Sequence, residues 1–325
     1  MLEGGPPEGP VALFGPKGRV DPGFVGPDAV HVTTLRPEWD RVSATGGNVA
    51  LRAPDGLSLA IVSVPKSRAQ GLGWVANALT ALAPGGRLVI DGQKAVGVDT
   101  ILKQVRAVLP LEGPLAKRHG KIAWCERPKN LPAEVAAWAE AAEPRRNADG
   151  FLTAPGMFSA DGIDAGTRVL MAHLPADAEG VAADFGAGWG ALSDALLTAA
   201  PGLERLDLVE ADRAALDAAE ANIDDPRARY HWADIARWEG GPYRLIVANP
   251  PFHAGRTADP DLGRAFIATA ARTLHPKGVF LLVANRQLPY EQALDSGFHV
   301  RETRAEGSGY KVIAASRPRR GRAAA

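Results

Sequence analysis

The chain has 325 residues, of which 46% are hydrophobic and 23% charged, as expected for a globular protein of about two domains. Lys+Arg and Asp+Glu both number 37, so the formal net charge is zero. This balance excludes a basic field over the whole molecule, and any contact with nucleic acid must come from a local patch. The single cysteine, Cys125, excludes an intramolecular disulfide and a multi-cysteine zinc site.

Targeting and metal signals are missing from the sequence. The seven histidines are scattered without paired spacing, which argues against a metal site. No apolar stretch approaches the ~20 residues needed to span a bilayer. The Gly- and Pro-rich N-terminus has neither the basic region nor the apolar region of a secretory signal. We therefore expect a cytoplasmic protein that binds no membrane and no metal.

A change in pattern between residues 126 and 150 marks a domain boundary. Three prolines and the pair Arg145-Arg146 flank a short alanine-rich segment there, for which we predict a helix over 133–142. The predicted order is a first domain over residues 1–132, a linker over 133–150, a second domain over 151–318 and a basic tail over 319–325.

The two halves repeat one order of elements. An apolar strand is followed by a helix, a Pro- and Gly-containing turn, a further strand and a last apolar strand near the end. The paired segments are 61–67 and 246–252, 68–82 and 262–274, 84–90 and 276–282, and 121–128 and 311–318. Unrelated α/β domains can share element order, but four landmarks in sequence favour duplication. We therefore predict two tandem doubly wound α/β domains.

The halves differ where a ligand would bind. In this alignment Val64 stands where the second half has Asn249, and Ser67 stands where it has Phe252. The first half also lacks a glycine-rich turn that an acidic residue precedes. We expect that the first domain keeps the fold without the chemistry, and that it holds the second domain and recruits substrate.

The second half contains a nucleotide-binding pattern. A short strand carries Asp184 and runs into the turn of Gly186, Gly188 and Gly190, where glycine allows close approach of a ligand. The next two strands end in Glu210 and Asp234. Glu210 is placed to accept hydrogen bonds from ribose hydroxyls, and Asp234 from an adenine amino group. Each acid could instead cap a helix or lie in solvent.

Residues 186–191 also fit the dinucleotide fingerprint G-x-G-x-x-G/A, so a dehydrogenase is an alternative. A dehydrogenase must bring a pyrophosphate to the helix N-terminus. The Asp184 carboxylate would repel that anion, whereas it suits a cofactor with an ammonium and a sulfonium group. The pattern therefore favours S-adenosyl-L-methionine and a methyltransferase.

The apolar run from Leu245 ends on Asn249-Pro250-Pro251-Phe252. Two prolines after a buried strand indicate a fixed loop at its carboxyl end, where ligands bind in open α/β sheets. The Asn249 side-chain oxygen, the Pro250 carbonyl and the Phe252 ring together suit a flat group that carries an NH2, such as a nucleobase or a carboxamide. The alternative is a turn in which the asparagine caps a helix and the phenylalanine is core.

With these motifs the chain resembles class I S-adenosylmethionine-dependent methyltransferases with a small domain, and within them the RsmC type, which methylates guanine N2 in bacterial small-subunit ribosomal RNA. Further landmarks of the resemblance are Pro155-Gly156-Met157-Phe158-Ser159, His253 and the segment 283–290. The resemblance covers nearly the whole chain and is weakest in the first half. It implies two tandem Rossmann-like methyltransferase-type domains, the first of them degenerate.

The resemblance also implies site residues and partners. Cofactor-binding residues would be Asp184, Gly186, Gly188, Gly190, Glu210, Asp234 and Asn249. Catalytic residues would be Asn249 and Pro250, which accept hydrogen bonds from the guanine amine, and Phe252, which stacks on the base. His253 could serve the substrate or have no task. We expect a monomer that acts on ribosomal RNA or the 30S subunit.

Contact with RNA must use local clusters of basic residues. One candidate is Lys117, Arg118 and Lys121, and the other is the tail with Arg317, Arg319, Arg320 and Arg322. Three alternative functions remain at this stage: methylation of large-subunit ribosomal RNA, methylation of a protein glutamine or a DNA adenine, and a non-enzymatic role in RNA binding and ribosome assembly.

Overall fold

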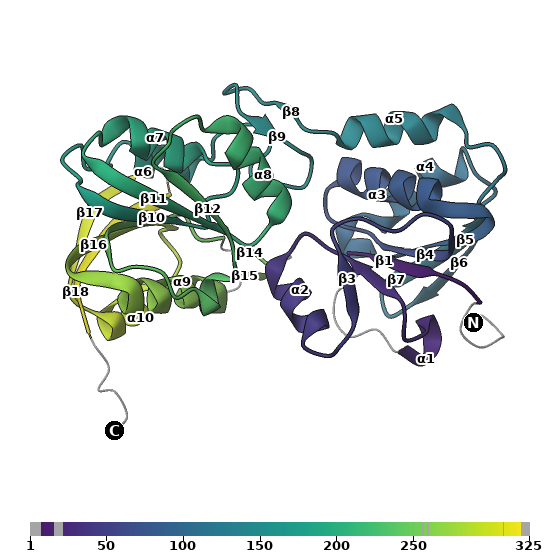
Figure 1. Ribbon diagram of the computed structural model, residues 1–325, viewed down its shortest axis with the longest axis horizontal. Helices are drawn as coiled ribbons and strands as arrows, with labels where there is room; N and C mark the ends of the chain where they lie inside the picture. The colour runs from purple at the N-terminus through teal and green to yellow at the C-terminus, as the bar shows by residue number, and fades with distance from the viewer. Residues whose placement is uncertain are drawn as a thin grey trace. The chain divides into compact units, whose positions relative to one another are not determined.

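The computed structural model describes residues 8–15, 22–251, 253–254, 257–258, 260–307 and 309–319. Two compact units divide the chain: Met1–Pro144 with Ala154–Gly156, and Arg145–Thr153 with Met157–Ala325 (Figure 1). The segment expected as a linker is split between them. Its helix packs on the first unit, where Val135 is part of the hydrophobic core, because the alanine-rich face offers apolar surface to bury.

The first unit is built on a seven-stranded sheet of order β3-β2-β1-β4-β5-β7-β6. All neighbours are parallel as far as β5, and β7 and β6 pair antiparallel. The strands are β1 (Val11–Phe14), β2 (Val30–Val32), β3 (Asn48–Ala50), β4 (Leu57–Ser63), β5 (Leu82–Gln93), β6 (Glu112–Lys117) and β7 (Gly120–Glu126). The helices are α1 (Pro22–Val25), α2 (Arg36–Ser43), α3 (Arg68–Ala81), η1 (Lys94–Val96), α4 (Val98–Arg106) and α5 (Ala133–Ala142).

The second unit repeats this topology with the order β12-β11-β10-β13-β16-β18-β17. Its strands are β10 (Gly180–Phe185), β11 (Leu203–Glu210), β12 (Ala228–Trp232), β13 (Tyr243–Ala248), β16 (Leu274–Asn285), β17 (Phe298–Gly307) and β18 (Tyr310–Pro318). Its helices are α6 (Ala165–Met171), α7 (Ala191–Ala199), α8 (Arg213–Asn222), η2 (Ile235–Arg237), α9 (Pro260–Thr273) and α10 (Glu291–Gly297). Two small hairpins pair β8 (Arg145–Arg146) with β9 (Leu152–Thr153) and β14 (His253–Ala254) with β15 (Thr257–Ala258). The prediction of two doubly wound domains is confirmed.

Helices cover both faces of the second sheet. Because side chains alternate along a strand, Leu245 and Val247 join the core under α6, α7 and α8, while Ile246 and Ala248 join the core under α9 and α10 (Figure 1). A strand buried on both faces has to be apolar throughout, which explains the uninterrupted run that precedes Asn249.

The strand pairing corrects the alignment of the two halves by one residue. Val62 pairs with Phe14 in the first sheet, and Ala248 pairs with Phe185 at the matching place in the second. Ser63, not Val64, therefore corresponds to Asn249. Because both strands are apolar runs, their sequences align almost equally well when one is shifted by one residue. The hydrogen bonds to neighbouring strands decide which alignment is correct.

Within the described residues, no helix combines the length and apolar character needed to cross a membrane. The same residues contain no cluster of three or more His, Cys, Asp or Glu side chains that could hold a metal ion.

Candidate cofactor and substrate site

The glycine turn joins β10 to α7 and has left-handed backbone at each of its three glycines. Gly186, Gly188 and Gly190 have φ values of 74°, 56° and 92°. A Cβ at Gly190 would lie 2.9 Å from Ile223 Cδ1, whereas a Cβ at Gly188 would meet nothing within 4 Å. Gly190 is therefore required for packing against α8, while the backbone at Gly188 borders open space that a ligand can approach.

Glu210 ends β11 beside this turn. Its Oε2 accepts a hydrogen bond from the Gly188 N–H at 2.8 Å, and its Oε1 accepts from the N–H groups of Ala211 and Asp212 at 2.7 and 2.8 Å. Burial raises the pKa of this carboxyl above its usual value, although these hydrogen bonds favour the charged form. The structure thus places Glu210 against the glycine turn, where the sequence predicted a ribose acceptor.

Asp184 lies behind the turn and does not line the pocket. It is only 1% exposed, and its Oδ2 accepts a hydrogen bond from Ser193 Oγ on α7 at 2.7 Å. Its Oδ1 has no hydrogen-bond partner. Burial, assisted by the nearby Glu210 charge, raises the pKa of Asp184 to about 7. A buried carboxyl with an unused acceptor is sensitive to positive charge placed at the turn.

Asp234 follows β12 and caps the short η2 helix, where its Oδ1 accepts from the Ala236 N–H at 3.0 Å. Helix capping was the alternative role that the sequence allowed for each acid, and Asp234 does form such a cap. The side chain is partly exposed, so capping leaves it accessible.

Asn249 stands at the carboxyl end of β13, next to β10 in the sheet. Its Nδ2 donates hydrogen bonds to Asp164 Oδ2 at 3.1 Å and to Thr167 Oγ1 at 2.8 Å. Pro250 is buried and Pro251 partly so. Phe252 lies outside the described residues, and of His253 only the backbone in β14 is described. The first part of the predicted loop is therefore in place at the sheet edge.

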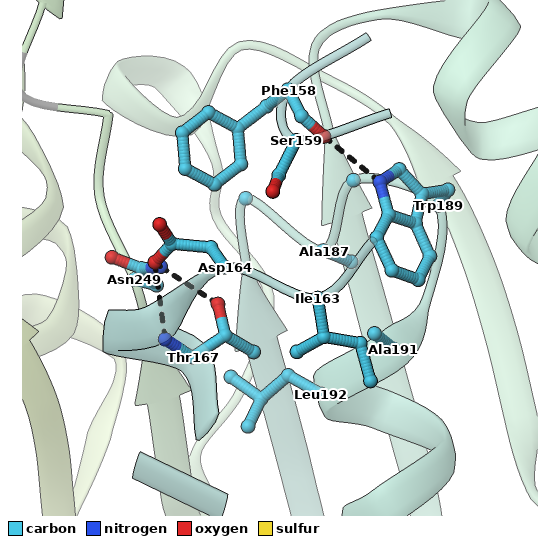
Figure 2. Close-up of a pocket in the computed structure, with 12 residues that line it drawn as sticks. Phe158, Ser159, Ile163, Asp164, Thr167, Ala187, Trp189, Ala191, Leu192 and Asn249 are labelled. Atoms are coloured by element: carbon cyan, nitrogen blue, oxygen red, sulfur yellow. Dashed lines mark hydrogen bonds between the residues drawn. The ribbon is translucent and has the colours of Figure 1, made fainter. Parts of the chain in front are cut away.

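A pocket with about 440 Å³ of empty space, its open mouth included, lies between the glycine turn and Asn249. Figure 2 shows Asn249, Asp164 and Thr167 on one side and Trp189 on the other, with Phe158 at the rim. Phe158 is 53% exposed, and its carbonyl accepts a hydrogen bond from Trp189 Nε1 at 2.9 Å. Lining residues are Phe158, Ser159, Ile163, Asp164, Thr167, Gly186, Ala187, Gly188, Trp189, Ala191, Leu192 and Asn249.

The sequence did not predict Asp164, Thr167 or Trp189 as site residues. Asp164 caps α6 by accepting from the N–H groups of Gly166 and Thr167. An aspartate directly before a helical segment is a recognisable signal for a cap. That signal gives no hint that the same carboxylate also contacts Asn249.

The basic residues suggested for RNA contact have different surroundings. Lys117 and Arg118 lie at the exposed turn of the β6–β7 hairpin. Lys121 forms an ion pair with Asp99, so part of its charge is already neutralised. In the tail, Arg319 Nε donates to the carbonyls of Asp295 and Phe298. Arg320 and Arg322 lie outside the described residues.

Comparison with known proteins finds similarity to methyltransferases over most of the chain. Residues 149–314 match the family model "Methyltransferase small domain". Ribosomal RNA small subunit methyltransferase C of Pseudomonas aeruginosa is 32% identical over 273 residues, which cover 82% of this chain and 81% of the relative. The protein of the same name from Shewanella loihica is 29% identical over 313 residues and 88% of each chain.

A solved structure is similar in both units. It is the T. thermophilus 16S rRNA N2 methyltransferase RsmC in complex with AdoMet and guanosine. Its TM-score is 0.77 at 26% identity, with 96% of this chain and 89% of that chain covered. The predicted resemblance is confirmed: the chain belongs to the methyltransferase small domain family and, within it, to the ribosomal RNA small subunit methyltransferase C family.

Proposed function

We propose that this protein transfers a methyl group from S-adenosylmethionine to the exocyclic N2 amine of a guanine in 16S ribosomal RNA. The observation that carries the proposal is the state of the Asn249 amide. Its NH2 is engaged by Asp164 and Thr167, which leaves Oδ1 as an acceptor at a pocket that the glycine turn also lines. The structural neighbour that binds AdoMet and guanosine supports this choice of cofactor and base.

The residues of the cofactor half fit the proposed cofactor. Glu210 presents a carboxylate beside Gly188, where it can accept hydrogen bonds from ribose hydroxyls, and Asp234 is accessible for an adenine amino group. The backbone of Gly186–Gly190 gives the close approach that a methionine moiety needs, with Asp184 behind it to balance positive charge. When bound, the cofactor supplies a methyl group on a positively charged sulfur.

The substrate amine would be held by two acceptors. Asn249 Oδ1 and the Pro250 carbonyl accept its two N–H groups, which turns the nitrogen lone pair towards the methyl donor. We assign stacking on the base to Phe252. Catalysis then depends mainly on positioning, and no strong base is needed because alkylation makes the nitrogen acidic. The base must leave its stack to reach the pocket, at a cost of a few kcal/mol.

RNA would be held outside the pocket by phosphate contacts. The exposed Lys117 and Arg118 are suited to this, and Lys121 less so because it pairs with Asp99. The remaining expectations belong to the same proposal: the 30S subunit or its RNA as the partner, a monomeric protein and a cytoplasmic location.

The test is methyl transfer from labelled cofactor to parallel substrates: small-subunit particles, large-subunit particles, free ribosomal RNA, DNA and release factors. Digestion of the labelled RNA to nucleosides should give N2-methylguanosine from 16S RNA. Label in a protein glutamine, in DNA adenine or in large-subunit RNA alone would overturn the proposal. Binding of the cofactor without transfer to any substrate would favour an assembly factor.

A further inference from the structure

Two side chains that are distant in the sequence accept hydrogen bonds from the amide of the proposed catalytic asparagine. We call this arrangement of Asp164 and Thr167 around Asn249 the clamp. Asp164 and Thr167 precede Asn249 by 85 and 82 residues and lie at the start of α6. Asn249 Nδ2 donates to Asp164 Oδ2 at 3.1 Å and to Thr167 Oγ1 at 2.8 Å, and all three residues line the pocket (Figure 2). Both protons of the amide nitrogen therefore have an acceptor.

The chemistry of these acceptors fixes which end of the amide faces α6. A carboxylate accepts hydrogen bonds and cannot donate, so the atom beside Asp164 has to be the NH2 group. Asp164 cannot turn away freely, because its Oδ2 also accepts the backbone N–H groups of Gly166 at 2.9 Å and Thr167 at 3.2 Å. Within the described residues Oδ1 of Asn249 makes no hydrogen bond, so it remains available to a ligand.

The orientation matters because a rotated amide would present the wrong group to the substrate. If the NH2 group of Asn249 pointed into the pocket, it would lie opposite the guanine amine. Both groups are donors, so no hydrogen bond could form between them. We propose that Asp164 and Thr167 are positioning residues that keep the acceptor end of Asn249 turned towards the substrate amine. The inference rests on the proposed function, since that function supplies the amine.

Burial makes the contribution of Thr167 measurable. The residue is 8% exposed, so water has little access to replace a lost hydroxyl. The first unit offers a contrast, because the residue that corresponds to Asn249 is Ser63, which has no side-chain amide to orient.

The test compares Thr167→Val, which has the same shape without the hydroxyl, with Thr167→Ser, which keeps it. Thr167→Val should lower kcat on ribosomal RNA by about ten-fold, because one N–H of the half-buried Asn249 amide is left without its acceptor. KM and the Kd for cofactor should stay within about two-fold, because the lost hydroxyl acts on the orientation of Asn249, which matters chiefly in the transition state. Thr167→Ser should recover most of kcat. Thr273→Val is the matched control, because it removes one buried helical hydroxyl outside the pocket.

Asp164→Asn separates positioning from charge. The asparagine oxygen can accept all three N–H groups that Asp164 Oδ2 now accepts, so the clamp should persist and kcat should fall by no more than a few-fold. A large rise in the Kd for cofactor would show that the Asp164 charge acts on the cofactor. That outcome would overturn a purely positioning role.

A spectroscopic readout makes the inference independent of turnover. In protein labelled with 15N at asparagine, the Asn249 side-chain signal is identified by its loss in Asn249→Ala. Thr167→Val should shift that signal and speed its hydrogen exchange, and Thr273→Val should not. If Thr167→Val leaves the hydrogen-exchange rate of the Asn249 side-chain amide unchanged, or has the kcat of the unsubstituted protein, the proposed clamp is wrong. If the natural protein forms no N2-methylguanosine, the proposed function fails, while the exchange comparison still decides the clamp.

Discussion

The two units share a strand order but differ at three strand ends, which carry Asp184, Glu210 and Asn249 in the second unit. The strand register pairs Phe14 with Val32 and Val62 in the first sheet, as it pairs Phe185 with Val209 and Ala248 in the second. The residues that stand at corresponding places are Leu13 and Asp184, Thr33 and Glu210, and Ser63 and Asn249. In this fold, then, the sheet is kept without the polar groups that would serve a cofactor.

The first unit satisfies its strand ends by simpler means. Leu13 is buried in an apolar cluster, where Asp184 in the second unit needs Ser193 as a partner. Thr33 accepts one backbone N–H, from Leu35, whereas Glu210 accepts three. The first unit thus closes its turns without these acids, and we propose that the acids of the second unit serve ligand binding as well as local structure.

Asn249→Ala should show the largest functional difference between the two units. Loss of an acceptor that acts chiefly in the transition state should lower the rate of methyl transfer by roughly 10³-fold while the Kd for cofactor stays within a few-fold. Ser63→Ala at the matching place of the first unit should leave the rate unchanged. Near-natural turnover in Asn249→Ala would remove the catalytic assignment.

Glu210→Ala should weaken cofactor binding by roughly 100-fold or more, because it removes the carboxylate that we propose accepts hydrogen bonds from ribose hydroxyls. Calorimetric titration measures the effect, and circular dichroism checks the fold, since three backbone N–H groups lose their acceptor. Thr33→Ala is the control in the first unit. An unchanged Kd in Glu210→Ala would take the residue out of the ribose role and reopen the dehydrogenase interpretation.

RNA binding should reverse the comparison and depend on the first unit. Joint replacement of Lys117 and Arg118 by Gln should weaken RNA binding by roughly ten-fold and reduce the salt slope by about one for each phosphate that the variant no longer neutralises. Lys121→Gln should have less effect, because Lys121 pairs with Asp99. Arg304→Gln in β17 of the second unit is the control for loss of one exposed charge, which there is paired with Glu302. Natural salt dependence in the double variant would exclude this cluster as an RNA-binding surface.

The smallest expected effect is a pH dependence of cofactor binding that only the second unit can show. The pKa of Asp184 in the free protein is about 7, and a cationic cofactor favours its ionised form. Binding should therefore release a proton near neutral pH, and the Kd should fall a few-fold between pH 6 and pH 8. Titrations in two buffers of different ionisation enthalpy detect the proton. Asp184→Asn should abolish this dependence, and persistence in the variant would assign it to another group.

The order of the elements and the fold class follow from local patterns in the sequence. Helix 133–142 was predicted with the bounds that the structure has, because an alanine-rich segment between prolines is a local signal. The glycine turn and the Asn249-Pro250-Pro251 loop were placed correctly at strand ends for the same reason. Glycine and proline limit the backbone wherever they occur.

The contacts between residues that are distant in the sequence depend on the packing of the whole second or first unit. This packing set the register that matches Ser63 with Asn249, put Asp184 behind the turn, paired Lys121 with Asp99, and brought Asp164 and Thr167 to the Asn249 amide. Each of these contacts joins segments whose spacing follows from strand pairing and helix packing. A local pattern in the sequence does not predict which distant residues come into contact, because the same residues would suit a solvated cap or an exposed charge equally well.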